Sequence, residues 1–139
     1  MADDPERIPL AVVGAHLAGE RLHHQLTDRG AVLIAATTTS ARYRFHVLDE
    51  PAPARPALER VADGASIEVE VWGLDPAGFG TFVAGVAPPL AIGSVELADG
   101  TWVSGFVCES GGLAAATDIT RFGGWRAWRA AQADPPKRL

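Results

Sequence analysis

The sequence has very little cysteine: Cys108 is the only one in 139 residues. A single cysteine excludes an intrachain disulfide, and it also excludes a zinc site built from four thiolates. Basic residues are outnumbered as well, with 12 lysines and arginines against 17 aspartates and glutamates, for a formal net charge of −5. Because an acidic chain offers no general attraction for a phosphate backbone, we expect no nucleic-acid partner.

Long hydrophobic runs are also missing. The longest apolar run, residues 31–36, is far too short to span a bilayer. The first seven residues are polar and acidic, without the apolar segment of a secretory signal. We therefore expect a cytoplasmic protein with no membrane partner.

The length of 139 residues is typical of one domain. It is too short for a complete serine-type amidase, a TIM barrel or a two-domain dinucleotide enzyme. We expect the folded domain to span residues 8–133. A flexible polar lead at residues 1–7 and a flexible, proline-containing tail at residues 134–139 are expected on either side.

Hydrophobic patterning predicts about six strands. They are expected where apolar residues run together or alternate with polar ones, at residues 8–15, 31–37, 42–47, 66–74, 92–97 and 102–108. Asp99 and Gly100 predict the turn of a hairpin between the last two strands. Residues 49–56, which include three prolines, predict an extended surface loop.

Capping residues predict about three short helices, at residues 20–29, at residues 75–85 and after a cap at Asp118 or Thr120. The last helix is expected to carry Phe122, Trp125 and Trp128 on one face. Strands and helices together predict a mixed α+β domain. So many strands in a short chain favour a small closed or nearly closed β-barrel, since closure removes exposed strand edges.

Common cofactor and metal motifs are missing from the sequence. Gly78 and Gly80 begin a pattern like the dinucleotide fingerprint, but the spacing after them is wrong, and there is no P-loop. The four histidines, at positions 16, 23, 24 and 46, do not form the His-Glu-x-x-His zinc motif. We therefore expect no cofactor and no metal, and the roles of His23 and His24 are left open.

One loop combines the features of an anion site. Gly14, Ala15, His16 and Leu17 lie where the first predicted strand gives way to a loop and a helix. Backbone N–H groups at such a position can hold an anion, and a histidine beside them can transfer protons near neutral pH. The alternative is a loop histidine that only hydrogen-bonds to nearby backbone.

This loop opens a longer resemblance. Residues 12–16, 25–27, 43–44, 67–72, 79–83, 89–97, 105–109 and 118–127 resemble, in this order, the C-terminal domain of allophanate hydrolase. The resemblance implies a γ-glutamyl cyclotransferase-like fold, which is a small barrel with helices. Two positions depart from the family pattern: His23 replaces the asparagine of Leu-Asn-x-Gln-Leu, and Ala91 replaces the first glycine of Pro-Leu-Gly-Ile-Gly.

The resemblance also implies a function. In the parent enzyme this domain follows an amidase domain that deaminates allophanate. The resemblance implies that it decarboxylates the product, N-carboxycarbamate, in urea and allophanate degradation. Because the chain holds no amidase, we expect a stand-alone version that receives this intermediate from a separate amidase protein, or that acts on another small carboxylate or amide. Assembly as a homodimer is left open.

Two other functions are kept as alternatives. A non-catalytic module would bind a small carboxylate, or dock on an amidase partner, without chemistry of its own. A γ-glutamyl cyclotransferase-like enzyme ranks third, because that chemistry uses an acidic residue in the segment that matches residues 79–90, where this chain has none.

Decarboxylation needs a proton donor, because loss of carbon dioxide leaves negative charge on nitrogen. His16 is the candidate catalytic residue. The candidate substrate-binding residues are Gly14, Ala15, Leu17, Gln25, Tyr43, Leu90, Ile92, Gly93 and Glu109. Three of them have simpler alternatives: Gln25 as a surface helix residue, Tyr43 as a hydroxyl bound to backbone, and Glu109 as a solvated carboxylate at a strand end.

Overall fold

The structure is a computed structural model that describes residues 6–133. Residues 1–5 of the lead expected at residues 1–7, and the whole tail expected at residues 134–139, lie outside the described residues. The elements in chain order are β1 (Ile8–Val12), α1 (His24–Thr27), β2 (Val32–Thr38), β3 (Tyr43–Leu48), β4 (Arg55–Arg60), β5 (Glu68–Leu74), α2 (Pro76–Ala84), β6 (Leu90–Glu96), β7 (Trp102–Cys108), η1 (Ser110–Ala115), β8 (Thr117–Asp118), η2 (Thr120–Phe122) and α3 (Trp125–Ala133).

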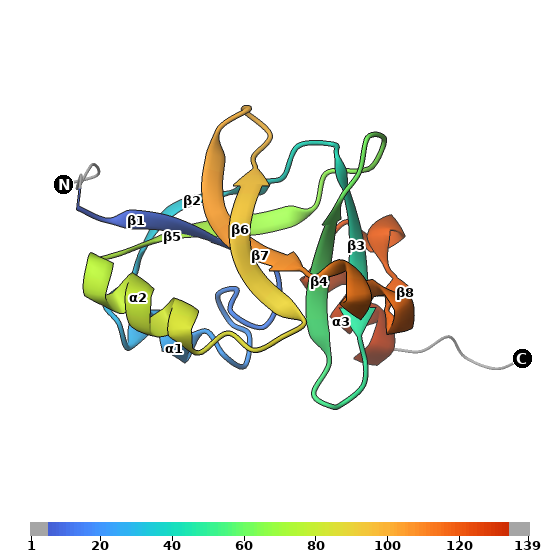
Figure 1. The fold of residues 1–139 in the computed structure, drawn as a ribbon, viewed down its shortest axis with the longest axis horizontal. Helices are drawn as coiled ribbons and strands as arrows, with labels where there is room; N and C mark the ends of the chain where they lie inside the picture. The colour runs from blue at the N-terminus through green and yellow to red at the C-terminus, as the bar shows by residue number, and fades with distance from the viewer. Residues whose placement is uncertain (1–5, 134–139) are drawn as a thin grey trace, which may run out of the picture.

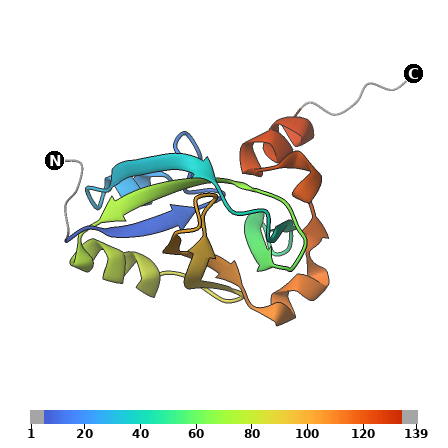
Figure 2. The same ribbon diagram turned by 90° about the horizontal axis from the view of Figure 1, so that it is seen from above.

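The strands form two sheets. A five-stranded sheet has the order β2-β5-β1-β7-β6, and a three-stranded sheet has the order β4-β3-β8. Figure 1 shows the larger sheet at the left and centre and the smaller one at the right. The sheets meet where β4 lies against β7. Figure 2 shows α2 and α3 on opposite sides of the molecule.

The mixed α+β class is confirmed. The strands do not close into a barrel within residues 6–133, because they divide between two sheets. Apolar side chains are buried in a core that the two sheets share, and not inside a closed barrel. The fully buried side chains of this core come from both sheets, from the first loop, from α1 and from the residue before β5: Leu10, Val12, Leu17, Leu26, Tyr43, Phe45, Val47, Ile67, Val69, Val71, Leu74 and Val95.

Local sequence signals are confirmed where they depend on near neighbours. Strands β6 and β7 pair antiparallel around the turn at Asp99 and Gly100, where Gly100 has a φ of 86° that favours glycine. Helix α2 begins at the predicted place because the Asp75 carboxylate accepts a hydrogen bond from the Gly78 N–H at 2.6 Å. These features are set by residues that are close in the sequence.

Two helices differ from the predictions. Helix α1 covers only four residues, His24–Thr27, because the chain before it folds into successive turns such as the bond from Leu22 N–H to the Ala15 carbonyl at 2.8 Å. The last helix, α3, begins at Trp125, so Phe122 lies outside it in the 3-10 turn η2. None of the helices in residues 6–133 is long and apolar enough to cross a membrane.

Strands β4 and β8 were not predicted. The expected loop at residues 49–56 overlaps the start of β4, and Pro56 is part of that strand. Proline is tolerated there because β4 is an edge strand, paired only with β3 in its sheet. Three consecutive buried residues, Pro56, Ala57 and Leu58, hide the alternation that usually marks a strand.

Asp118 in β8 is expected to make stability depend on acid pH. Its carboxylate accepts hydrogen bonds from the Arg44 guanidinium at 2.7 Å and from the Thr120 N–H at 2.8 Å. Burial by itself raises the pKa of Asp118, but the hydrogen bonds from Thr120 and Arg44 outweigh it and lower the pKa to about 2 from 3.8. Because the folded pKa is the lower one, the stabilisation is present above about pH 4 and is lost as the pH falls through the folded value.

The Asp118→Asn variant is expected to have a smaller fall in stability between about pH 4 and pH 2 than the wild type. Both side chains of the pair are about two-fifths exposed, 42% for Arg44 and 40% for Asp118. Solvent therefore screens the interaction, and the variant should lose about 1 kcal/mol of unfolding free energy at most at neutral pH. Urea unfolding at a series of pH values measures this. Identical pH dependence in variant and wild type would contradict the role of Asp118.

Candidate functional site

A pocket of about 320 Å³ opens at the end of β1, where the loop of residues 13–23 meets α1, α2, β4 and the start of β6. The loop follows the last three residues of β1, Leu10, Ala11 and Val12, which are buried and fix where it begins. The lining residues are Val13, Gly14, Ala15, His16, Arg21, Leu22, Gln25, Arg29, Arg55, Pro56, Thr81, Phe82, Gly85, Val86, Ala87, Leu90 and Phe106. The pocket therefore joins segments that are far apart in the sequence.

His16 lies half-buried in the wall of this pocket between two aromatic rings. It stacks on Phe106 with ring centroids 5.4 Å apart, and it makes a T-shaped contact with Phe82 with ring centroids 4.9 Å apart. Its Nε2 lies 2.8 Å from Gln25 Oε1. Because an amide oxygen only accepts hydrogen bonds, Nε2 carries a proton in this contact. The ring is therefore fixed in position, and Nδ1 is the nitrogen left for a ligand.

The protonation of His16 is set mainly by its burial. Burial lowers the pKa of the imidazole below 6.5, and the hydrogen bond to Gln25 opposes this in part. Positive charge on Arg21 and on the two neighbouring histidines lowers the pKa further. The ring is consequently neutral at pH 7 without a ligand. An anion in the pocket would favour the charged form, because opposite charges stabilise each other.

Two backbone N–H groups in the loop are available to a ligand. The N–H groups of Ala15 and His16 donate no hydrogen bond to another residue of the described part of the chain, whereas Leu17 N–H bonds to the Gly14 carbonyl. Successive N–H groups in a turn form a concave site for an anion. The anion site expected from the sequence around Gly14 and Ala15 stays a prediction.

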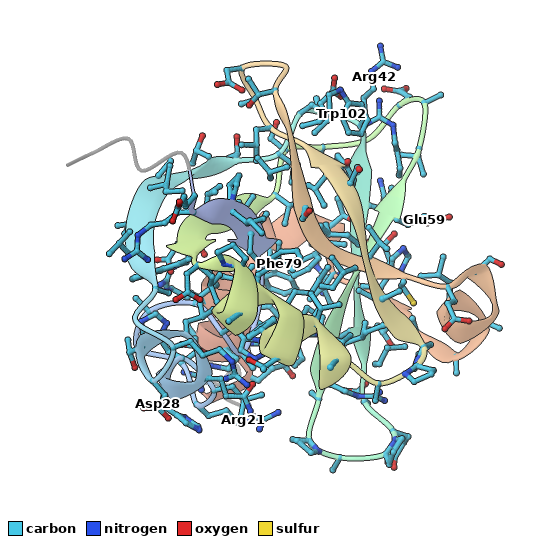
Figure 3. The ribbon with its side chains drawn as sticks, turned by 60° about the vertical axis from the view of Figure 1, so that its left-hand side comes forward. Arg21, Asp28, Arg42, Glu59, Phe79 and Trp102 are labelled. Atoms are coloured by element: carbon cyan, nitrogen blue, oxygen red, sulfur yellow. The ribbon has the colours of Figure 1, made fainter. Side chains whose placement is uncertain are left out.

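Three arginines, Arg21, Arg29 and Arg55, also line the pocket. Arg29 donates to the Thr81 hydroxyl at 3.0 Å and to the Gln25 carbonyl at 2.8 Å, and Arg55 donates to a backbone carbonyl. None of the three pairs with a carboxylate within residues 6–133, and the lining itself contains no aspartate or glutamate. Figure 3 shows Arg21 at the lower edge of the molecule, beside the loop that leads into α1. The pocket is therefore strongly cationic in an acidic protein.

The structure brings together five of the predicted site residues: Gly14, Ala15, His16, Gln25 and Leu90 all line the pocket. The remaining ones lie outside its lining. Leu17 is fully buried in the core, and the Tyr43 hydroxyl accepts hydrogen bonds from the Glu96 N–H at 2.9 Å and from Arg60 at 3.4 Å.

Ile92, Gly93 and Glu109 lie farther along β6 and after β7. Ile92 and Gly93 pair with Phe106 and Gly105 of β7, so they belong to the body of the larger sheet. Glu109 is exposed and precedes η1. Within the β6 segment, Leu90 is therefore the predicted residue that reaches the pocket.

Sequence reasoning missed the three arginines. Arg21 and Arg29 flank α1, whereas Arg55 comes from β4, a strand that was not predicted. A local motif could not join them, since only the tertiary fold brings the three residues into one pocket lining. Arg29 had one usable signal, because it follows Gln25 by four residues, a spacing that places two residues on the same face of a helix.

Gly14 allows the loop to pack closely against β4. A Cβ atom built on Gly14 would overlap the ring of Pro56. We expect Gly14→Ala to lower the free energy of unfolding by about 1–3 kcal/mol, the usual cost of overpacking, and to displace the loop that carries His16. Urea unfolding measures this loss.

Gly80→Ala is the matched control, because a Cβ atom on Gly80 meets no atom within 4 Å. Gly80 lies inside α2, where alanine is favoured over glycine by about 0.5–1 kcal/mol. The two substitutions are therefore expected to change stability in opposite directions. Equal stability of the Gly14→Ala variant and the wild type would contradict the close packing of the loop.

The fold and the pocket define a small α+β domain with a half-buried histidine in a cationic site. The profile of the family described as the allophanate hydrolase C-terminal domain matches residues 8–130. The chain belongs to this family, which confirms the resemblance found in the sequence.

Curated relatives and solved structures support this assignment. Urea amidolyase of Saccharomyces cerevisiae is 44% identical over 131 residues, which cover 91% of this chain and 7% of that protein. A structure of Kluyveromyces lactis allophanate hydrolase is 41% identical with a TM-score of 0.87, covering 91% of this chain and 21% of that one. A crystal structure of a uropathogenic E. coli-specific protein is 30% identical with a TM-score of 0.81, covering 89% of this chain and 96% of that one.

The chain thus spans a small part of the urea amidolyase and of the allophanate hydrolase that it matches. It corresponds to one domain of each. Two further solved structures, at 17% and 15% identity with TM-scores of 0.67 and 0.64, share the fold alone.

Proposed function

We propose that this protein binds N-carboxycarbamate in the pocket around His16 and accelerates its decarboxylation. The observation that carries the proposal is the cationic lining: three arginines without a carboxylate partner in the described chain, beside the N–H groups of Ala15 and His16. N-carboxycarbamate carries two carboxylates on one nitrogen. A pocket with several separate donors to anions suits a small dianion better than a neutral ligand.

The proposed reaction breaks one C–N bond. The bond's electron pair stays on nitrogen, carbon dioxide leaves, and a proton reaches that nitrogen, so the products are carbon dioxide and carbamate. His16 supplies the proton from Nδ1, because Nε2 is held by Gln25. The bound dianion raises the pKa of His16, so binding of the substrate brings the imidazole into its acid form.

The arginines and the loop have different roles in this proposal. The N–H groups of Ala15 and His16 hold the carboxylate that remains on carbamate. Arg21, Arg29 and Arg55 attract the dianion and orient it. Phe82 and Phe106 pack on the imidazole and keep water from its faces. The apolar wall also favours departure of uncharged carbon dioxide.

The alternatives fit the pocket less well. A γ-glutamyl cyclotransferase reaction needs a carboxylate as acid and base, and the described lining holds none. A non-catalytic module that docks on an amidase partner would leave the decarboxylation rate unchanged. Association with an amidase and a cytoplasmic location are part of this proposal.

The test is a coupled assay with an amidase domain that releases N-carboxycarbamate from allophanate. Carbon dioxide and ammonia release are followed with and without this protein. We expect a catalytic amount of the protein to accelerate carbon dioxide release, with saturation as the intermediate accumulates. If the protein binds the amidase stoichiometrically but leaves the rate of carbon dioxide release unchanged, the proposal is contradicted and the non-catalytic module is supported.

A further inference from the structure

Arg126 on α3 reaches across to the loop that carries His16. Its guanidinium donates to the Ala18 carbonyl at 2.8 Å and to Glu70 Oε2 at 2.9 Å. It also donates to Glu68 Oε2 at 3.0 Å. One planar group therefore joins the C-terminal helix, strand β5 and the loop of residues 13–23. Such a fork of donors fixes geometry as well as charge.

Glu70 is the other half of this contact. Its side chain is 9% exposed, and its Oε1 accepts from the Ala18 N–H at 2.8 Å and from the Trp72 indole at 3.1 Å. Burial by itself raises the pKa of Glu70, but hydrogen bonds from Arg126, Ala18 and Trp72 lower it, so the carboxylate is charged. Both the N–H and the carbonyl of Ala18 are consequently held by the Glu70–Arg126 pair.

The same pair is connected to His16 by a second route. The His16 carbonyl accepts a hydrogen bond from His23 Nδ1 at 2.8 Å. The His23 ring meets the Trp72 ring edge-on at 4.7 Å, and Trp72 is a donor to Glu70. His16 is thus restrained through its own carbonyl and through Ala18, two residues later.

We propose that Glu70 and Arg126 are positioning residues of the pocket, which hold the Ala18 peptide so that the His16 ring and the Ala15 and His16 N–H groups face the ligand. The importance of this geometry for activity rests on the proposed function, whereas the geometry itself does not. The Glu70 side chain is nearly buried and the Arg126 side chain is 35% exposed. An ion pair in such a place adds little net stability, so a role in placing the loop accounts for it better.

The test compares Arg126→Gln with Arg44→Gln. Arg44 makes an arginine–carboxylate contact of the same kind with Asp118, away from the pocket. Malonate is the probe, as a stable small dicarboxylate. We expect Arg126→Gln to weaken malonate binding roughly 10- to 100-fold, which is the usual effect of losing one hydrogen bond to a charged group. Arg44→Gln should bind malonate as the wild type does.

Two readouts do not need a ligand. Hydrogen exchange of the amides in residues 14–18 should be faster in Arg126→Gln than in Arg44→Gln. The NMR titration of the His16 ring should move upward toward 6.5, because a loosened loop exposes the ring and removes the burial that lowers its pKa. Arg21, His23 and His24 act on His16 electrostatically, and all three are unchanged in these variants.

Further variants separate geometry from charge. Arg126→Lys keeps the charge but cannot form all three contacts, so it should restore binding only in part. The double variant Glu70→Gln with Arg126→Gln keeps the net charge of the wild type and leaves no unpaired buried charge. It replaces Arg126→Gln in the test if the single variant does not fold, and it should show the same faster exchange.

The outcomes distinguish this inference from the proposed function. Binding, exchange and titration of Arg126→Gln that match Arg44→Gln would overturn the positioning role, as would full rescue by lysine. If the wild type itself binds no dicarboxylate, the proposed function fails. Exchange and titration then still decide whether Glu70 and Arg126 hold the loop.

Discussion

Replacing His16 by asparagine is expected to slow the decarboxylation of N-carboxycarbamate by about 10²- to 10⁴-fold in kcat, the usual contribution of a positioned general acid. Asparagine fills similar space between Phe82 and Phe106 but cannot deliver a proton near neutral pH. The arginines and the backbone N–H groups are unchanged, so KM should change much less than kcat. Carbon dioxide release in the coupled assay gives both constants.

His24→Asn is the matched control. His24 is an exposed residue at the start of α1, eight positions after His16. The same substitution there should leave the rate close to the wild-type value, because His24 has the smallest of the named influences on the pKa of His16. A folded His16→Asn variant that decarboxylates at the wild-type rate would exclude His16 as the proton donor.

Removing two guanidinium groups from the pocket is expected to have the second large effect. Hydrogen bonds to charged groups contribute about 1.5–3 kcal/mol each, so the double variant Arg21→Gln with Arg29→Gln should bind malonate at least about 100-fold more weakly. Titration calorimetry at low ionic strength measures this loss. The wild type should also prefer malonate to acetate, and the double variant should lose most of that preference.

Arg44→Gln with Arg121→Gln is the matched control for charge. It removes the same two positive charges from β3 and η2, neither of which contributes to the pocket lining. Malonate affinity should therefore stay near the wild-type value. An equal loss in both double variants would indicate a general effect of net charge and would contradict a specific dicarboxylate pocket.

Much of the fold could be predicted because the signals are local. The alternation of Tyr43, Phe45 and Val47 marks their buried face, and all three side chains are buried as expected. The turn at Asp99 and the cap at Asp75 depend on contacts within three residues. Such features need no knowledge of the tertiary structure.

The unpredicted elements depend on distant partners. Strand β4 exists because its residues pair with β3, and Pro56 and Leu58 are buried by packing that no local pattern reveals. Strand β8 has two residues and is held by β3. The strands divide into two sheets and do not close into a barrel. This too depends on which strand edges pair in the tertiary structure.

The same distinction applies to the site. The loop from Gly14 to His16 could be predicted because a glycine, a histidine and the end of a strand lie together in the sequence. The cationic lining could not, since Arg21 and Arg55 come from separate elements. Tyr43 illustrates the opposite case: its position on a buried face is right, but its hydroxyl is used by Arg60 and the Glu96 N–H.

A crystal structure with malonate tests the central claim most directly. We expect one carboxylate within hydrogen-bond distance of the Ala15 and His16 N–H groups and the other among the pocket arginines, with His16 Nδ1 facing the central carbon. Density for malonate elsewhere on the protein, or an empty pocket at concentrations that saturate binding in solution, would contradict the claim.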